Sequence, residues 1–290
     1  MNGQYWIGMP VDQLPTPALI VDIEAMARNM ETMANYLTRT KIKLRPHAKS
    51  HKTPAIGHMQ MRAGAVGLCC ATVGEAEVMV YSGIPEVMIA NEVVDPLSLR
   101  RAVNLSRQAK VMMIVDDVQN VRNLSAVARQ YGAKIEVLAD LDVGQGRCGA
   151  RSLEQIVEVA REVERSPGLI LKGVFGYEGH VQFITDRAER VQKGQAANSK
   201  LVQAAKELAG LGMNIEIVSG AGTGTYDIAA EFAGMTEIQA GSYIFMDGTY
   251  QKVGLPFEQS LTVLATVVSR PSEDVAVFDV GIKGISPERF

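Results

Sequence analysis

The sequence contains little cysteine, no long apolar segment and no excess of basic residues. Its three cysteines include the adjacent pair Cys69 and Cys70, which does not suit a disulfide framework and predicts a reducing, cytoplasmic setting. No apolar run reaches the ~20 residues that a membrane-spanning helix needs. Residues 1–13 lack the apolar core of a secretory signal. A net charge of −3 without a basic run argues against nucleic-acid binding.

The chain does contain a regular alternation of strand-like and helix-like segments. Short apolar runs predict strands at 42–46, 66–70, 87–90, 111–115, 135–141, 170–175, 215–218 and 236–239. Segments with apolar residues at helical spacing lie between them, as at 24–39, 117–131, 153–163 and 185–210. Runs that are apolar throughout indicate strands buried on both faces of a parallel sheet. Eight such units predict a (β/α)8 barrel over 23–252, with a doubly wound open sheet as the alternative.

The pattern changes near the C-terminal end of the sequence. Two β-rich runs, 260–269 and 274–280, follow each other without a helix between them. Together with the N-terminal segment they predict a partial second domain of β type, formed by 1–22 plus 253–290. We expect the C-terminal part of that domain to be missing from this chain.

Polar and glycine-rich residues follow several of the predicted strands, where a barrel of this kind has its active site. The first strand leads into Arg45-Pro-His-Ala-Lys49-Ser-His51-Lys52, which alone is either a solvated basic turn or a site of amine chemistry. Ser219-Gly-Ala-Gly-Thr-Gly-Thr225 and Gly241-Ser-Tyr243 follow the last two strands, and their glycines and hydroxyls predict a phosphate site. A strand-end lysine opposite a phosphate site suggests pyridoxal phosphate, whose aldehyde reacts with a lysine amine.

These motifs resemble those of the fold-type III pyridoxal-phosphate enzymes of the D-threonine aldolase and D-serine dehydratase group. The segments 14–22, 45–52, 142–149, 219–225 and 241–247 carry the resemblance, and the barrel is more remotely similar to that of alanine racemase. The resemblance implies that Lys49 holds the cofactor and that Arg147 and Tyr177 face its ring. The residues implied on the phosphate side are Ser219, Gly222, Thr223, Gly224, Gly241, Ser242, Tyr243 and Tyr250.

The resemblance also implies a lyase that acts on β-hydroxy D-amino acids, most closely a retro-aldol cleavage to glycine and an aldehyde. His180 or His51 would serve as the base. The alternatives are a dehydratase or aldolase of D-serine or 3-hydroxy-D-aspartate, an amino-acid racemase, and a protein that binds pyridoxal phosphate without turnover. Relatives in this group use a divalent metal (Mn²⁺, Mg²⁺ or Zn²⁺), whose ligands we expect outside this chain. We expect a homodimer with a small D-amino acid as its substrate.

Overall fold

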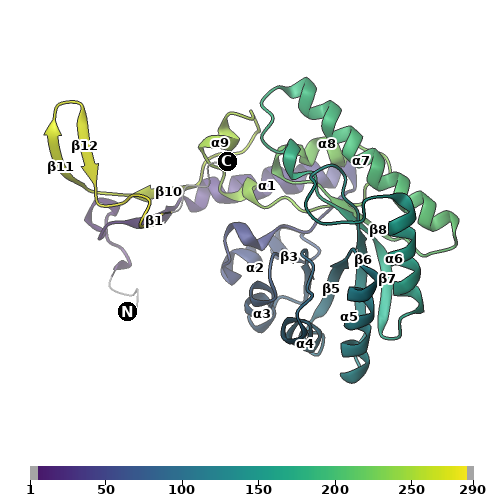
Figure 1. Cartoon of the computed structure of the whole chain (residues 1–290). Coiled ribbons are helices and arrows are strands. Elements are labelled where there is room, and N and C mark those ends of the chain that lie inside the picture. Colours follow the sequence, from purple (N-terminus) through teal and green to yellow (C-terminus); the bar gives the residue numbers. More distant parts are fainter. Residues whose placement is uncertain (1–5, 286–290) are drawn as a thin grey trace.

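Eight parallel strands form the centre of the computed structural model, which describes residues 6–285 (Figure 1). Their order in the sheet is β2-β9-β8-β7-β6-β5-β4-β3. Strands β3 to β9 thus follow one another in sequence order, and β2 pairs with β9 at the opposite end of the order from β3. The strands are β2 (Lys43–Leu44), β3 (Leu68–Cys70), β4 (Glu86–Ile89), β5 (Lys110–Val115), β6 (Ile135–Asp140), β7 (Leu169–Gly176), β8 (Ile217–Gly220) and β9 (Glu237–Ile238).

The two ends of this sheet also meet, which closes it into a barrel. His47 and Cys69 form a parallel bridge, and the N–H of Cys69 donates to the carbonyl of Pro46 at 2.9 Å. The N–H of Val66 donates to the carbonyl of Leu44 at the same distance. The predicted (β/α)8 barrel is therefore confirmed, and the alternative of an open doubly wound sheet was wrong.

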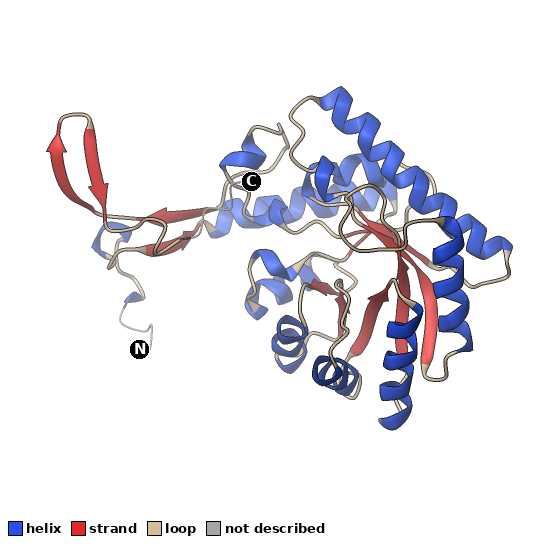
Figure 2. Ribbon diagram, viewed as in Figure 1, coloured by secondary structure: helices blue, strands red, loops and turns tan. Residues whose placement is uncertain are grey.

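Helices cover the outside of the sheet (Figure 2). They are α1 (Ile23–Thr40), α2 (Pro54–Arg62), α3 (Val73–Tyr81), α4 (Pro96–Leu105), α5 (Val118–Gln130), α6 (Leu153–Arg165), α7 (Arg187–Gly210), α8 (Tyr226–Ala230) and α9 (Gly248–Gln251). Most of the longer ones begin at a side chain that accepts a hydrogen bond from the first turn, which satisfies a backbone donor without a partner inside the helix. These capping residues are Asp22, Thr72, Asp95, Asp117, Ser152 and Asp186.

The barrel has two apolar cores that explain its continuous apolar strands. A small inner core fills the barrel with Cys69, Met88, Met112, Leu138 and their neighbours. A larger outer core lies between the strands and the helices. Because successive strand residues point to opposite faces, both cores draw on the same strands.

Short turns of 3-10 helix lie at the carboxyl ends of several strands and place polar residues there. They are η3 (Ala48–Ser50) after β2, η4 (Gly179–Val181) after β7, η5 (Thr223–Thr225) after β8 and η6 (Ser242–Ile244) after β9. These four turns follow β2, β7, β8 and β9, which are consecutive neighbours around the barrel. They therefore gather at one side of its mouth.

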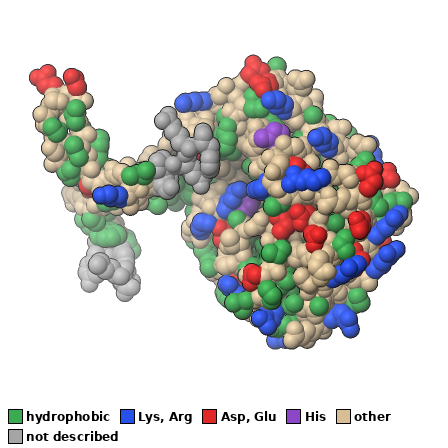
Figure 3. Space-filling view, viewed as in Figure 1, with side chains coloured by type: hydrophobic (Ala, Val, Ile, Leu, Met, Phe, Trp, Pro, Cys, Tyr) green, Lys and Arg blue, Asp and Glu red, His purple; other side chains and the backbone are tan. Residues whose placement is uncertain are grey.

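An arm extends from the barrel (Figure 1). Strand β1 (Ala18–Val21) pairs antiparallel with β10 (Leu261–Leu264), and β11 (Val267–Ser272) pairs with β12 (Val275–Phe278). Figure 3 shows hydrophobic side chains along this arm and mixed charges over the barrel. The division into two domains stays a prediction, and its residues 1–5 and 286–290 lie outside the described part. Within residues 6–285, no helix is both long enough and apolar enough to span a bilayer.

Candidate active site

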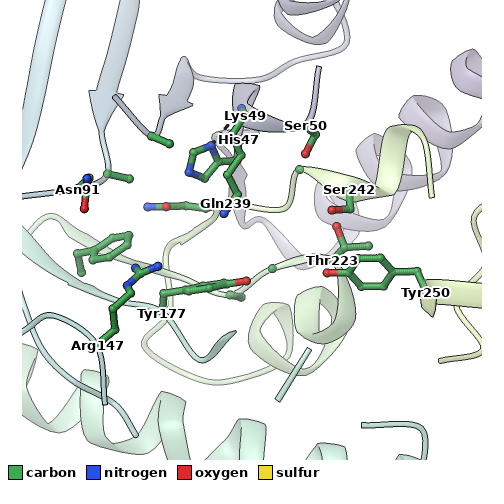
Figure 4. A pocket seen from close by; sticks show the side chains of 16 residues that line it. His47, Lys49, Ser50, Asn91, Arg147, Tyr177, Thr223, Gln239, Ser242 and Tyr250 are labelled. Carbon is green, nitrogen blue, oxygen red and sulfur yellow. Dashed lines mark hydrogen bonds between the residues drawn. The ribbon is translucent and has the colours of Figure 1, made fainter. Parts of the chain in front are cut away.

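A cavity opens at the mouth of the barrel, above the carboxyl ends of the strands (Figure 4). Lys49 reaches it from η3, Tyr177 from the end of β7, Thr223 from η5 and Ser242 from η6. Of the predicted site residues, those that line the cavity are Lys49, Arg147, Tyr177, Gly222, Thr223, Gly241, Ser242 and Tyr250. Segments far apart in the sequence thus meet around one lysine.

The amine of Lys49 lies near the ring of Tyr177. Its Nζ is 5.6 Å from the ring centre, and the guanidinium carbon of Arg147 is 5.8 Å from the same centre. Burial raises the pKa of Tyr177, so its phenol keeps its proton at neutral pH. The cavity therefore has two cationic groups and a neutral phenol around one aromatic ring.

His47 adds a neutral imidazole to the wall of the cavity. Burial and then the charge of Lys49 lower the pKa of His47 well below its ordinary value. Its Nδ1 accepts a hydrogen bond from the backbone N–H of Lys49 at 3.4 Å, so the proton of the neutral ring resides on Nε2. His47 thus presents a donor to the cavity and fixes the turn that carries the lysine.

Hydroxyl groups gather at one end of the cavity, on the loops after β8 and β9. Figure 4 shows the side chains of Thr223, Ser242 and Tyr250 converging there. The N–H of Tyr243 donates to Oγ1 of Thr223 at 3.0 Å, which joins the two loops and leaves the Thr223 hydroxyl to donate elsewhere. Thr223 and Ser242 each begin a helical turn, so their own N–H groups have no acceptor inside the turn, whereas the next N–H groups, of Gly224 and Tyr243, donate to Gln182 and Thr223. This end of the cavity suits an anion.

Gly241 allows the lysine turn to lie close to this anion-binding end. A Cβ atom at Gly241 would lie 2.6 Å from Oγ of Ser50 and 2.8 Å from the carbonyl oxygen of His47. Any larger residue would push η3 away from the loop after β9. The glycine therefore sets the separation between the Lys49 segment and the hydroxyl groups.

The donor set of the cavity fits pyridoxal phosphate. The hydroxyl end matches a phosphate, the amine of Lys49 matches an aldehyde, and Tyr177 with Phe175 offers a flat aromatic boundary for a ring. Arg147 supplies a cation on the same side as Tyr177. The residues that would hold the cofactor are thus present in one place.

Three predicted cofactor residues lie behind the cavity wall instead of on it. The hydroxyl of Ser219 donates to Glu237 at 2.8 Å, and the N–H of Gly224 donates to Oε1 of Gln182 at 2.8 Å. The hydroxyl of Tyr243 accepts from Gln60 at 3.1 Å. Their polar groups shape the loops from behind.

The two histidines predicted as bases also lie off the cavity wall. Nδ1 of His51 accepts from the N–H of Thr53 at 3.0 Å, so Nε2 donates to Oε1 of Gln60 at 3.2 Å. Both ring nitrogens of His51 are therefore occupied within the chain. His180 is exposed at the rim, against Gly144 of the loop that carries Arg147.

Sequence reasoning missed several residues of the cavity wall, above all Asn91 and Gln239. Asn91 lies two residues after the end of β4, and Gln239 directly follows β9. The strand-end rule that found Lys49 would also have found them, since each is the first polar residue after a buried run. His47 and Ser50 flank the lysine and line the cavity too.

A metal site is not formed by the part of the chain that the structure describes. Across residues 6–285, no three side chains of His, Cys, Asp or Glu are grouped so that they could hold a metal ion. The described residues thus do not fit the divalent metal that the resemblance implies.

Comparison with known proteins places this fold and cavity among characterised relatives. Residues 21–249 match the family described as alanine racemase, N-terminal domain. The chain is 38% identical to D-threonine aldolase of Arthrobacter sp. over 97% of its own length and 75% of the relative's. It is 35% identical to 3-hydroxy-D-aspartate aldolase of Paracoccus denitrificans (strain Pd 1222) over 96% and 75%. The crystal structure of D-threonine aldolase from Filomicrobium marinum superposes with a TM-score of 0.91 at 40% identity, covering 93% of this chain and 74% of that one.

Proposed function

The chain belongs to the alanine racemase N-terminal domain family, in the group of D-threonine and 3-hydroxy-D-aspartate aldolases, and we propose that it cleaves β-hydroxy D-amino acids to glycine and an aldehyde. It is a lyase of this family. The observation that carries the reaction is the placement of Lys49 in one cavity with the hydroxyl groups of Thr223, Ser242 and Tyr250.

Each residue of the cavity has a part in this proposal. Thr223, Ser242 and Tyr250 bind the phosphate of pyridoxal phosphate, and Tyr177 and Arg147 orient its ring. When bound, the cofactor withdraws electrons from the substrate and so weakens the bond between Cα and Cβ. Lys49 holds the cofactor and exchanges a proton with the incoming substrate amine. The proton that leaves the β-hydroxyl is balanced by one that Cα takes up after the bond breaks, which gives glycine.

The remaining parts of the proposal rest on the resemblance and on single observations. The free, buried thiols of Cys69 and Cys70 support a reducing compartment such as the cytoplasm. The pairing of β1 with β10 supports a β domain formed by 1–22 and 253–290. The resemblance alone supports a homodimer and a divalent metal. The proposed reaction assigns no step to a metal.

We expect the protein to convert D-threonine into equal amounts of glycine and acetaldehyde when pyridoxal phosphate is supplied. The products can be measured by chromatography, with and without Mn²⁺, and L-threonine is the matched control substrate. A 2-oxo acid with ammonia would instead indicate the dehydratase, and L-threonine or L-alanine formed from the D-isomer would indicate the racemase. A cofactor-loaded protein that forms no product under either condition would contradict the lyase proposal.

Removing His180 is expected to slow cleavage about 100-fold if it takes the proton of the β-hydroxyl, which is within the range for a general base. We keep His180 as the proposed base because, unlike His51, it is open to solvent at the rim of the mouth. Burial lowers the pKa of His180 below its ordinary 6.5, so the ring is neutral at pH 7 and activity should fall only as the pH drops through that lowered pKa.

The variant to test is His180→Phe. Its control is His58→Phe, because Nε2 of His58 donates to the carbonyl oxygen of Ser82 at 2.8 Å, away from the cavity wall. The acidic limb of the pH–rate profile should disappear in His180→Phe and persist in His58→Phe. An unchanged rate and profile in His180→Phe would remove this histidine from the mechanism.

A further inference from the structure

The turn η4, which follows Tyr177, packs against the outer face of the loop after β8. That loop, residues 221–225, lines the cavity with Ala221, Gly222 and Thr223 on its inner face. Its outer face contacts two fully buried polar side chains, Glu178 at 1% exposure and Gln182 at 0%. Neither side chain lines the cavity, and neither has a part in the function proposed above.

Both carboxylate oxygens of Glu178 are used to hold this loop. Oε2 accepts the backbone N–H of Ala221 at 3.2 Å. Oε1 accepts the hydroxyl of Thr225 and, at 3.1 Å, the side-chain amide of Gln182. Burial raises the pKa of Glu178, whereas these donors favour its charged form and oppose that rise. A buried carboxyl with this many donors is satisfied and so has a fixed position.

Gln182 holds the other half of the loop. Its Oε1 accepts the N–H of Gly224 at 2.8 Å, and its Nε2 donates to the hydroxyl oxygen of Thr225 at 2.9 Å. A Cβ atom at Gly222 would lie 2.5 Å from Oε1 of Gln182, and one at Gly224 would collide with the Gln182 backbone. The two glycines are therefore required by the close packing of η4, in addition to any ligand.

The loop needs this support because of the conformation of Ala221. Its φ of +62° lies in the left-handed region, which is unfavourable for a residue with a Cβ atom. Such a conformation persists only where the surroundings impose it. The hydrogen bond from Ala221 to Glu178 fixes the peptide at that position, so Glu178 decides where the next residues, Gly222 and Thr223, face the cavity.

We propose that Glu178 and Gln182 are positioning residues that set the affinity of the 221–225 loop for the phosphate group of the cofactor. This inference rests on the proposed function, because that function assigns a phosphate to the loop. It predicts that their loss weakens binding of pyridoxal phosphate but not of pyridoxal, which has the same ring and aldehyde and lacks the phosphate.

The main variant is Glu178→Gln. Its amide oxygen can replace one carboxylate oxygen as an acceptor. Its NH₂ group then replaces the other oxygen and faces a donor, either the N–H of Ala221 or the donors of Thr225 and Gln182. At least one hydrogen bond is therefore lost. We expect the dissociation constant of apoprotein for pyridoxal phosphate to rise about tenfold, since one such loss in a buried site has that order of effect. Affinity for pyridoxal should change less than about twofold. Both are measured by absorbance or fluorescence titration.

Two further variants separate positioning from a general loss of stability, and a third is a substitute for Glu178→Gln. Ala221→Gly in the Glu178→Gln background removes the strain that Glu178 offsets, and we expect it to restore much of the affinity for pyridoxal phosphate. Leu124→Ala, in the outer core on α5, lowers stability at a distance and should leave both affinities unchanged. Gln182→Met, which keeps the volume and removes both polar contacts, repeats the test if Glu178→Gln does not fold.

The outcomes are distinct. An equal loss of affinity for both ligands in the Glu178 and Gln182 variants, or no loss for either, would overturn the positioning role while the proposed function stands. A failure of the Ala221→Gly substitution to restore affinity would overturn the role of Glu178 in holding Ala221. Unmodified protein that binds neither ligand would overturn the proposed function together with this inference.

Discussion

Replacing Lys49 with alanine is expected to lower the rate of D-threonine cleavage about 1,000-fold or more, because the variant lacks the amine that we propose to hold the cofactor and exchange the proton. Among the residues that the structure describes, Lys49 is the lysine that lines the cavity, and its Nζ lies over the ring of Tyr177. The hydroxyl end of the cavity does not contain Lys49, so the variant should still bind phosphate. Glycine formation measures the rate, and a phosphate titration checks that the site is intact.

Lys52 provides the matched control for this substitution. It lies three residues further along the same basic stretch, but its side chain forms an ion pair with Glu75 and does not line the cavity. Lys52→Ala should therefore retain most of the activity. Borohydride reduction of the cofactor-loaded protein, followed by mass spectrometry, should place the cofactor on Lys49. A label on Lys43 or Lys52, or an active Lys49→Ala variant, would refute the assignment.

The barrel could be predicted because its signals are local and repeated. Each strand is a short apolar run, and most of the longer helices begin at a capping residue, so neighbouring residues determine most elements. The active-site end then follows from a general property of these barrels. That property alone predicts that Lys49, Thr223 and Ser242 lie together at one end of the barrel.

The direction of individual side chains in the loops could not be predicted in the same way. Ser219 and Ala221 are two residues apart, yet the alanine lines the cavity and the serine bonds to Glu237 behind it. His51 is two residues from Lys49, but Thr53 and Gln60 occupy its ring nitrogens. These outcomes depend on partners from distant elements and on turns such as η3, whose geometry is not visible in residue order.

Arg45 is the residue of the basic stretch for which sequence and structure differ most. By position it belongs to an exposed basic turn, but its side chain is only 2% exposed. Its Nε donates to Glu237 at 3.0 Å, and its NH2 group donates to Glu86 at 2.7 Å. Glu237 is also 2% exposed and accepts the hydroxyl of Ser219. Two buried charges therefore join β2 to β9 below the cavity.

Arg45→Met is expected to lower the free energy of unfolding by about 3–5 kcal/mol, because Glu237 would remain as a buried carboxylate without its cation. Urea denaturation measures the change. Arg28→Met is the control, since Arg28 pairs with Glu258 on the surface with both side chains about half exposed, and solvent screens such a pair so that its loss should change stability little. The double variant Arg45→Met, Glu237→Gln removes both charges and should recover part of the loss. If Arg45→Met costs no more than Arg28→Met, the buried pair does not stabilise the attachment of β2 to β9. A large loss would instead mean that the stretch carrying Lys49 is anchored at its first residue, Arg45, by a buried charge pair.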